Sequence, residues 1–97
     1  MSGAVVKVVA RVAEREPQTF KGRFAFTLHK LSEAGQRGAT SLDFPTGARV
    51  SHYVFGLRRD GVGIATTHER HTGPFSGHHA RYRLTTPVEI LAVETKP

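Results

Sequence analysis

The spacing of apolar residues along the chain changes from the runs typical of strands to the period of helices. Ala4–Val12 is rich in β-branched residues and predicts a strand. The polar segment 14–17 ends in proline and predicts a turn. Over residues 20–34 the apolar positions fall on one stripe, which predicts a helix with Thr19 as its N-cap and Gly35 as its stop.

A second, very short helix is expected around residue 42. Thr40 is followed three residues later by Asp43, which is a helix-start pattern, and Pro45 limits this helix to at most about two turns. We expect Leu42 and Phe44 to anchor the segment in the core.

The pattern of residues 48–60 predicts a third helix, which is amphipathic. Its single apolar stripe has the spacing i, i+3, i+4, i+7 and comprises Val50, Tyr53, Val54 and Leu57. The opposite face comprises Arg49, Ser51, His52, Phe55, Gly56, Arg58 and Arg59. Gly61 ends the helix.

The rest of the chain predicts three strands. Segments 63–69 and 80–84 have strand composition, with Ile64 facing inward, and the Gly-Pro-rich segment 72–77 is the loop between them. Segment 88–93 is a last apolar strand. It is expected to pair with the first strand, either within the chain or across a dimer.

Helix, strand, loop and strand in this order are the layout of a winged helix. The expected fold class is therefore α+β, a winged helix-turn-helix of three helices and a β-hairpin wing with extra N- and C-terminal strands. Ninety-seven residues suffice for one core only. Within it, residues 1–16 are expected to form the N-terminal strand and linker, and residues 17–97 the winged-helix domain.

The charge of the chain indicates an acidic partner. The net charge is +6 and the isoelectric point about 10.5, so DNA, RNA and anionic membrane surfaces are the candidates. Cysteine is absent, which excludes disulfides, thiolate zinc sites and cysteine nucleophiles and fits a cytosolic protein. The sequence has no run of about 18 apolar residues, so no membrane span is predicted. The first apolar run is a poor signal peptide.

Neither catalysis nor metal binding is expected. The sequence has no Gly-x-Ser-x-Gly motif and no Gly-rich phosphate loop, so we predict no enzyme and no cofactor. His68, His71, His78 and His79 could in principle converge on zinc. Without thiolate ligands, however, a basic hairpin is the better interpretation of these histidines, and no metal site is predicted.

Five motifs in the stretch 19–91 resemble a family of small winged-helix proteins of alphaproteobacteria and their phages. They are a Glu-Ala-Gly-type helix end (31–35), a Gly-x-Thr-x-Leu helix start (38–42), a Tyr-Val-x-x-Leu-Arg helix (53–58), an Ile-x-Thr-x-x-Glu strand (64–69) and a Gly-Pro-Phe-x-Gly-x-His-x-Arg-Tyr wing (73–82). The resemblance implies a winged-helix fold. It implies DNA binding only as far as that fold does.

We expect the third helix to enter the major groove of DNA, because that groove admits one α-helix. Arg49, Ser51 and His52 lie at the beginning of the helix and would reach base edges, with Arg49 suited to guanine. Arg58 and Arg59, at its far end, would meet phosphate, although they also suit the negative C-terminal end of a helix.

The hairpin is expected to lie on the flanking backbone or in the minor groove. Its candidate contacts are Arg70, His71, His78, His79 and Arg81. Alternatively, His79 or Arg81 braces the strand pair through Glu69. Lys21 and Arg23, at the start of the first helix, are further candidates for phosphate contacts.

Together these features predict a sequence-specific double-stranded DNA-binding protein, a small transcription regulator in the bacterial cytoplasm, associated with the nucleoid. The two terminal strands are candidate edges for a homodimer. One alternative is a protein-interaction or assembly module, which Phe55 and Gly56 on the outer face of the third helix support. Another is non-specific packaging of nucleic acid.

Overall fold

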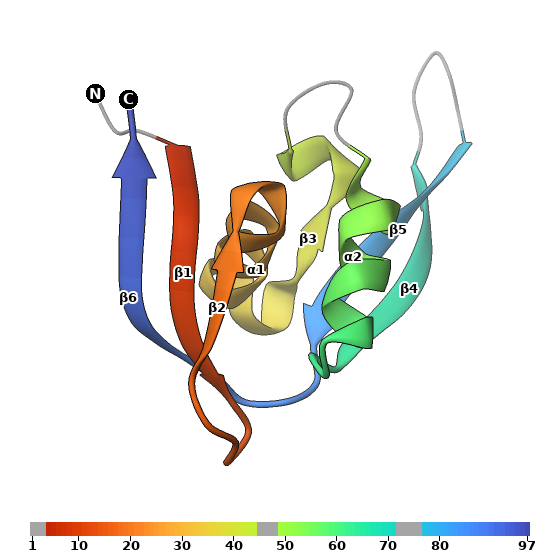
Figure 1. The fold of residues 1–97 in the computed structure, drawn as a ribbon. Coiled ribbons are helices and arrows are strands. Elements are labelled where there is room, and N and C mark those ends of the chain that lie inside the picture. Colours follow the sequence, from red (N-terminus) through yellow and green to blue (C-terminus); the bar gives the residue numbers. More distant parts are fainter. Residues whose placement is uncertain (1–3, 45–48, 72–76) are drawn as a thin grey trace.

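Two antiparallel sheets of three strands each enclose helix α1 in the structure, a computed structural model (Figure 1). The structure describes residues 4–44, 49–71 and 77–97. The strands are β1 (Ala4–Val12), β2 (Gln18–Lys21), β3 (Ala39–Thr40), β4 (Ile64–His71), β5 (Gly77–Leu84) and β6 (Val88–Lys96). The helices are α1 (Gly22–Ala34) and α2 (Val50–Arg59), together with the 3₁₀ helices η1 (Gly35–Arg37) and η2 (Ser41–Asp43).

β1 is the central strand of the first sheet, whose order is β2-β1-β6. Val8, Ala10 and Val12 share one face of β1 and are fully buried on the side of α1, because alternate side chains of a strand point the same way. β6 pairs with β1 antiparallel within the chain and continues beyond residue 93. Of the two expected arrangements for this strand pair, the one within the chain is therefore confirmed.

The segment before α1 is a strand and not the first turn of the helix. β2 places Phe20 opposite Val8, where its side chain is only 4% exposed. The helix begins at Gly22, with Lys21 as an N-cap whose side chain makes no capping hydrogen bond. The predicted helix start at residue 20 and the predicted cap Thr19 are therefore wrong. Gly22 has a φ of 63°, a left-handed conformation that allows the sharp change from strand to helix and that a side chain disfavours.

α1 buries the stripe that the sequence pattern predicts. Leu28 and Leu31 are fully buried, and Thr27 beside them is 1% exposed. The Thr27 hydroxyl donates a hydrogen bond to the carbonyl oxygen of Arg23 at 2.8 Å, which satisfies its buried polar atom. The helix ends at Gly35, as expected.

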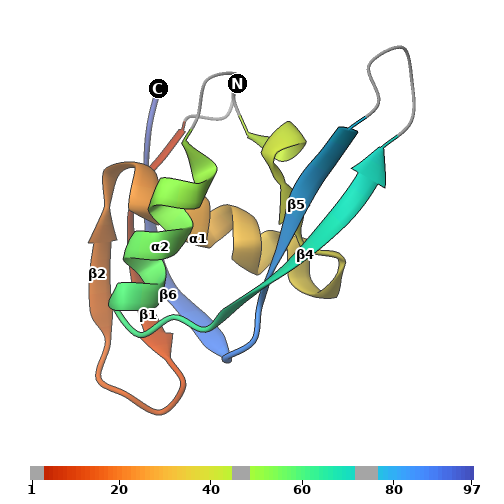
Figure 2. The ribbon, with the colours of Figure 1, turned by 90° about the vertical axis from the view of Figure 1, so that its right-hand side faces the viewer.

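The second sheet has the order β3-β5-β4, and β4 and β5 form a long antiparallel hairpin (Figure 2). The pairing runs from Ile64 opposite Leu84 to His71 opposite Gly77, so both strands extend further toward their connection than expected. Ile64 is buried, which confirms that it faces inward. Residues 72–76 of the predicted loop 72–77 are outside the described residues, whereas Gly77 belongs to β5.

The expected second helix is only the three-residue turn η2, so the described chain has two α-helices and not three. The predicted start is confirmed: the Thr40 amide donates to Asp43 Oδ2 at 2.8 Å, and the Leu42 amide donates to Thr40 Oγ1 at 3.2 Å. Phe44 is extended, because a residue before proline avoids the helical conformation, and this ends the turn. Pro45 itself lies outside the described residues.

Only one of the two apolar residues of this turn is buried. Phe44 is 8% exposed and contacts Phe26 edge to face with 6.2 Å between ring centroids, so its anchoring role is confirmed. Leu42 is 77% exposed, and its predicted burial is wrong. A turn this short directs successive side chains in different directions, so it cannot place both residues in the core.

α2 packs its apolar stripe inward as expected, although it begins at Val50 and ends at Arg59. Val50, Val54 and Leu57 are buried and Tyr53 is half-buried.

Gly56 is buried as well, so its predicted place on the outer face of this helix is wrong. A Cβ at Gly56 would overlap the ring of Phe24 on α1. The ring of Phe24 in turn contacts Tyr53 edge to face at 5.2 Å between centroids. Glycine therefore allows α1 and α2 to approach each other closely at this point.

Candidate nucleic-acid interface

The outer face of α2 is polar and cationic except for one aromatic side chain. Ser51, Phe55 and Arg59 follow one another at intervals of four residues and are all exposed. Arg49, at the N-cap, and His52 are exposed beside them. The helix contains no aspartate or glutamate, so nothing on α2 itself neutralises these cations.

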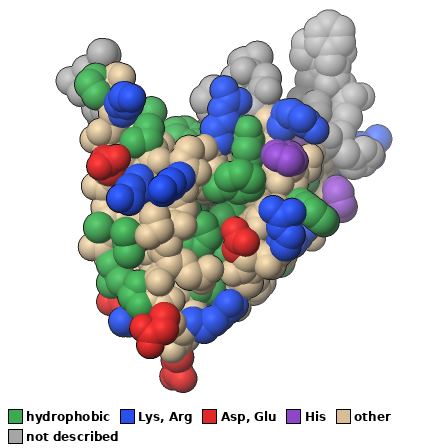
Figure 3. All heavy atoms as spheres, viewed as in Figure 1, with side chains coloured by type: hydrophobic (Ala, Val, Ile, Leu, Met, Phe, Trp, Pro, Cys, Tyr) green, Lys and Arg blue, Asp and Glu red, His purple; other side chains and the backbone are tan. Residues whose placement is uncertain are grey.

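Charge is distributed unevenly over the surface. In Figure 3 the visible side chains over α2 and the hairpin include arginine and histidine, whereas most acidic side chains lie over the first sheet and the turn at its lower end. Arg49 to Leu84 contains six arginines against one aspartate and one glutamate, so this segment carries +4 of the net charge of +6. The helix and the hairpin are therefore the part of the surface to which an acidic partner is attracted.

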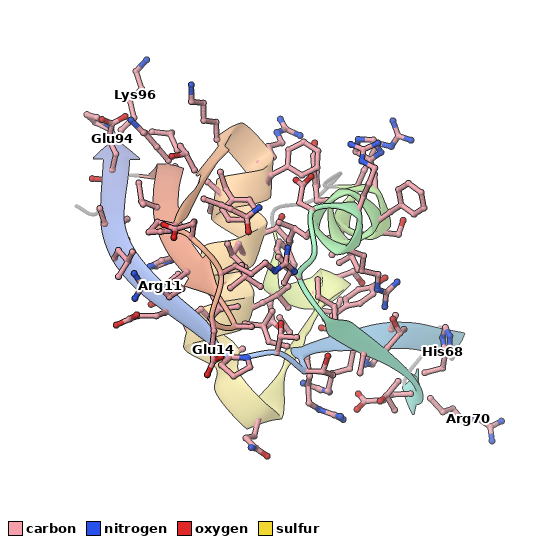
Figure 4. The ribbon with its side chains drawn as sticks, turned by 60° about the horizontal axis from the view of Figure 1, so that its bottom comes forward. Arg11, Glu14, His68, Arg70, Glu94 and Lys96 are labelled. Atoms are coloured by element: carbon pink, nitrogen blue, oxygen red, sulfur yellow. The ribbon has the colours of Figure 1, made fainter. Side chains whose placement is uncertain are left out.

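One face of the hairpin turns toward α2. Arg58 Nη2 donates to Thr66 Oγ1 at 2.7 Å, so the Thr66 side chain points at the helix. His68 and Arg70 are two and four residues further along β4 and share this face by alternation. Both are largely exposed, and Figure 4 shows them at the far end of the hairpin. Arg70 is one of the predicted contacts. His68 is not among them, although the alternation of Thr66, His68 and Arg70 in the sequence places it on the same face.

The opposite face of the hairpin carries a cluster of paired charges. Arg81 Nε donates to Glu69 Oε2 at 2.7 Å, and His79 Nε2 lies 3.1 Å from Glu69 Oε1. Arg81 Nη1 also donates to the carbonyl oxygen of Arg37 at 3.0 Å. The hydrogen bond from Arg81 lowers the pKa of Glu69, and the same contact raises the pKa of Arg81. The predicted bracing of the strand pair through Glu69 is confirmed, and DNA contacts by His79 and Arg81 stay predictions.

Arg58 ties the end of α2 to β4. Its Nε and Nη2 donate to the carbonyl oxygen of Ile64 at 3.1 and 2.8 Å, in addition to the bond to Thr66. These contacts fix the angle between the helix and the hairpin. A phosphate contact by Arg58 stays a prediction. Arg59, the neighbouring residue, is exposed.

Lys21 and Arg23 lie where the chain passes into α1, next to a residue that contacts α2. Both are exposed where β2 passes into α1. The next residue, Phe24, has its ring 6.0 Å from the ring of His52 on α2, measured between centroids. The structure thus brings the beginning of α1 close to the predicted α2 contacts. The side chains of His71 and His78 lie outside the described part of the chain, and only their backbone pairing at the end of the hairpin is described.

An open hollow of about 400 Å³ separates the beginning of α2 from β5. It is lined by Ser41, Arg49, Val50, Ser51, His79, Ala80 and Tyr82. Two of the predicted helix contacts, Arg49 and Ser51, thus share one concave surface with β5.

The described residues contain neither a candidate membrane-spanning helix nor a cluster of potential metal ligands. No helix there has both the length and the apolar character needed to cross a membrane. Over the same ranges, no three histidine, cysteine, aspartate or glutamate side chains lie close enough together to hold a metal ion.

Comparison with known proteins identifies the family of this chain. A family model described as a winged helix domain matches residues 17–94, from the residue before β2 into β6. No curated protein and no solved structure matches the chain. The match confirms the winged-helix resemblance, while an origin in alphaproteobacteria or their phages stays a prediction. Because the match spans most of its length, the chain belongs to the winged helix domain family.

Proposed function

We propose that this protein binds double-stranded DNA sequence-specifically and acts as a small transcription regulator. In this proposal α2 lies in the major groove, and the hairpin of β4 and β5 lies on the flanking backbone or in the minor groove. The observation that carries the proposal is the outer face of α2, which is cationic, free of carboxylates and on the same side as one face of the hairpin. Winged-helix domains commonly bind DNA, which adds support.

The dimensions of α2 suit the groove. Ten residues give a helix about 15 Å long, and the major groove, about 12 Å wide, accepts a helix of ordinary diameter. Arg49 and Ser51, at the beginning of α2, would meet base edges, and Arg49 can form the paired hydrogen bonds that recognise guanine. His52 and Arg59 would then face the walls of the groove, where the phosphates lie.

The hairpin would supply the second contact. His68 and Arg70 are on the face that turns toward α2, so a duplex lying against the helix would pass over them. Lys21 and Arg23 would meet phosphate on the other side of α2. Contacts of this kind hold the protein in register and make binding depend on salt, while the base contacts of the helix provide sequence preference.

We also propose that the protein acts as a homodimer in the bacterial cytoplasm, where the chromosomal DNA is. β6 is an edge strand of the first sheet, and Leu91 and Val93 on it are each 43% exposed. An edge strand presents unpaired backbone groups, and a strand of a second copy can form hydrogen bonds with them and extend the sheet. Sedimentation equilibrium at micromolar concentration should give twice the chain mass, and a monomer would contradict this part of the proposal.

A second candidate function is a protein-interaction module without DNA binding. The 65% exposure of Phe55 favours it, because large exposed apolar side chains often mark binding surfaces. Gly56 gives it no support, since this residue is buried against Phe24. The variant Arg49→Ala with Arg59→Ala separates the two functions. If the protein binds DNA, this variant should lose affinity for the duplex. If it binds a protein through Phe55, the variant should still bind that partner.

The most informative test is selection of bound duplexes from a random pool. The expected result is a defined motif, with two half-sites at fixed spacing if the protein is a dimer. Enrichment should weaken as salt rises, because phosphate contacts release counterions. Failure to enrich any sequence at about 0.1 M salt would contradict the proposal, and equal retention of all sequences would indicate non-specific packaging instead.

A further inference from the structure

Phe55 occupies the middle of the exposed face of α2. It lies one turn after Ser51 and one turn before Arg59, and its side chain is 65% exposed. Among the described residues, no other aromatic ring stacks on it, in contrast to Phe24, Tyr53 and His52, which contact one another. Most of the ring therefore projects from the protein surface.

The direction of this projection follows from the period of the helix. Val50, Val54 and Leu57 face the core, and at 3.6 residues per turn Phe55 lies on the far side of the helix from the centre of that stripe. When a helix lies in the major groove, the middle of its outer face is nearest the base edges, and its flanks are nearest the phosphates. Phe55 would then meet bases, while His52 and Arg59 would meet phosphate.

A phenyl ring can recognise only one feature of the major groove. It has no hydrogen-bonding atom, so it cannot read the donors and acceptors that the bases present there. The C5-methyl group of thymine is the apolar group on that surface, and phenylalanine is one of the side chains that contact it. The absence of carboxylates on α2 and the flanking arginines Arg49 and Arg59 favour a nucleic acid over an apolar protein surface as the neighbour of this ring.

We propose that Phe55 is a specificity-determining residue that recognises thymine by packing its ring against the C5-methyl group. The inference rests on the proposed function, because it requires α2 to lie in the major groove. It adds a base preference that hydrogen bonding by Arg49 or Ser51 does not supply. The expected contribution is about fourfold in affinity for each methyl group contacted, which corresponds to the burial of one methyl group.

The test compares two versions of one duplex. The duplex most enriched in the random-pool selection is synthesised once with thymine and once with deoxyuridine, which removes every C5-methyl group and leaves the hydrogen-bonding atoms unchanged. We expect the unmodified protein to bind the thymine duplex about fourfold more tightly or better. Phe55→Ala should bind both duplexes equally, with the affinity that the unmodified protein has for the deoxyuridine duplex. Phe55→Leu should keep part of the preference.

Arg59→Ala is the matched control on the same face. It should weaken binding to both duplexes by the same factor and leave the preference for thymine intact, because its partner is phosphate. Circular dichroism should show the same thermal midpoint for Phe55→Ala and the unmodified protein, since the side chain is exposed.

Four results would overturn the inference. Equal binding of both duplexes by the unmodified protein would show that no methyl group is contacted. If Phe55→Ala still prefers the thymine duplex, the preference arises from the shape of the DNA. Loss of self-association in Phe55→Ala with unchanged DNA binding would assign the ring to a protein contact. No binding to any duplex would instead remove the proposed function, which distinguishes that failure from the first three.

Discussion

The two sides of the molecule, which α1 separates, differ in how their charged side chains are arranged. Between β1 and β6 of the first sheet, opposite charges face each other: Arg11 Nη1 lies 3.3 Å from Glu89 Oε1, and Lys7 is directly opposite Glu94 in the register. On the other side, α2 carries arginines and no carboxylate. Figure 4 places the side chains labelled on β1 and β6 far from the hairpin end.

This difference shows that the basic character of the chain is a local property. Two cations of β1 have a glutamate of β6 across from them, so this strand pair attracts an acidic partner weakly. The helix and hairpin keep an excess of positive charge at the surface, and the hairpin carboxylate Glu69 is held on the face turned away from α2. If the protein binds DNA, the cations of α2 should matter greatly, and the cations of β1 and β6 should matter little.

The largest effect is expected for removal of two arginines from α2. Arg49→Ala with Arg59→Ala should weaken duplex binding by at least about thirtyfold, since each such contact contributes about 1–3 kcal/mol. Arg11→Ala with Lys96→Ala removes the same charge from the first sheet and is the matched control. Fluorescence anisotropy at fixed salt measures both variants. Similar losses of affinity in the two variants would mean that only net charge matters, and would contradict the difference between the two sides of the molecule.

The next largest effect concerns the inner side of α2. Gly56→Val should lower the free energy of unfolding by about 1–3 kcal/mol, because the new side chain overlaps the Phe24 ring in a packed core. Ser51→Val, on the exposed side of the same helix, controls for the helix propensity of valine and should change stability by less than about 0.5 kcal/mol. Urea denaturation measures both. Equal stability of the two variants would mean that α2 is not packed against α1 as described.

A smaller effect is expected where η2 begins. Asp43→Ala should lower stability by about 0.5–2 kcal/mol, the usual contribution of a capping side chain. The backbone hydrogen bond from Thr40 lowers the pKa of Asp43, so its contribution is present at neutral pH and is lost as the pH falls through this lowered pKa. Thermal melting at pH 7 and at pH 2 measures it. A penalty of the same size at both values would contradict the role of the carboxylate. Ser41→Ala, an exposed neighbour, is the control.

The smallest effect is expected for the ion cluster of the hairpin. The hydrogen bond from Arg81 lowers the pKa of Glu69, so the carboxylate stabilises the fold above the ordinary glutamate pKa of about 4.3, and this stabilisation is lost on acidification through the lower folded value. Glu69→Gln should remove this part of the acid dependence. Carboxyl NMR titration should give a midpoint below about 4.3 for Glu69. A midpoint at or above that value would mean that the contact with Arg81 does not persist in solution.

Local patterns predicted most elements of the fold because apolar periodicity directly reports which face of an element is buried. The stripes of α1 and α2, the strands β1, β4, β5 and β6, and the capping pair Thr40 and Asp43 all follow from neighbouring residues. The burial of Gly56 could not be predicted in this way, because glycine has no side chain that indicates which face is buried. Its burial depends on the ring that crosses it from α1.

Other features depend on partners distant in the sequence. β2 is only four residues long, and its strand character appears only in its pairing with β1. Whether β6 pairs within the chain is likewise decided by long-range contacts. In the candidate site, the cationic face of α2 follows from its periodicity. The contacts of Arg58 with Ile64 and Thr66 do not, because they require the angle between helix and hairpin that only the folded chain defines.

The most direct test of the difference between the two sides is NMR mapping of the bound surface. Amide shifts are followed while the duplex enriched from the random pool is added to labelled protein. Perturbations are predicted along α2, centred on Ser51, Phe55 and Arg59, and on β4 around His68 and Arg70. The amides of β1 and β6 should keep their positions. Perturbations centred on the first sheet, or an unchanged spectrum at saturating duplex, would contradict the account.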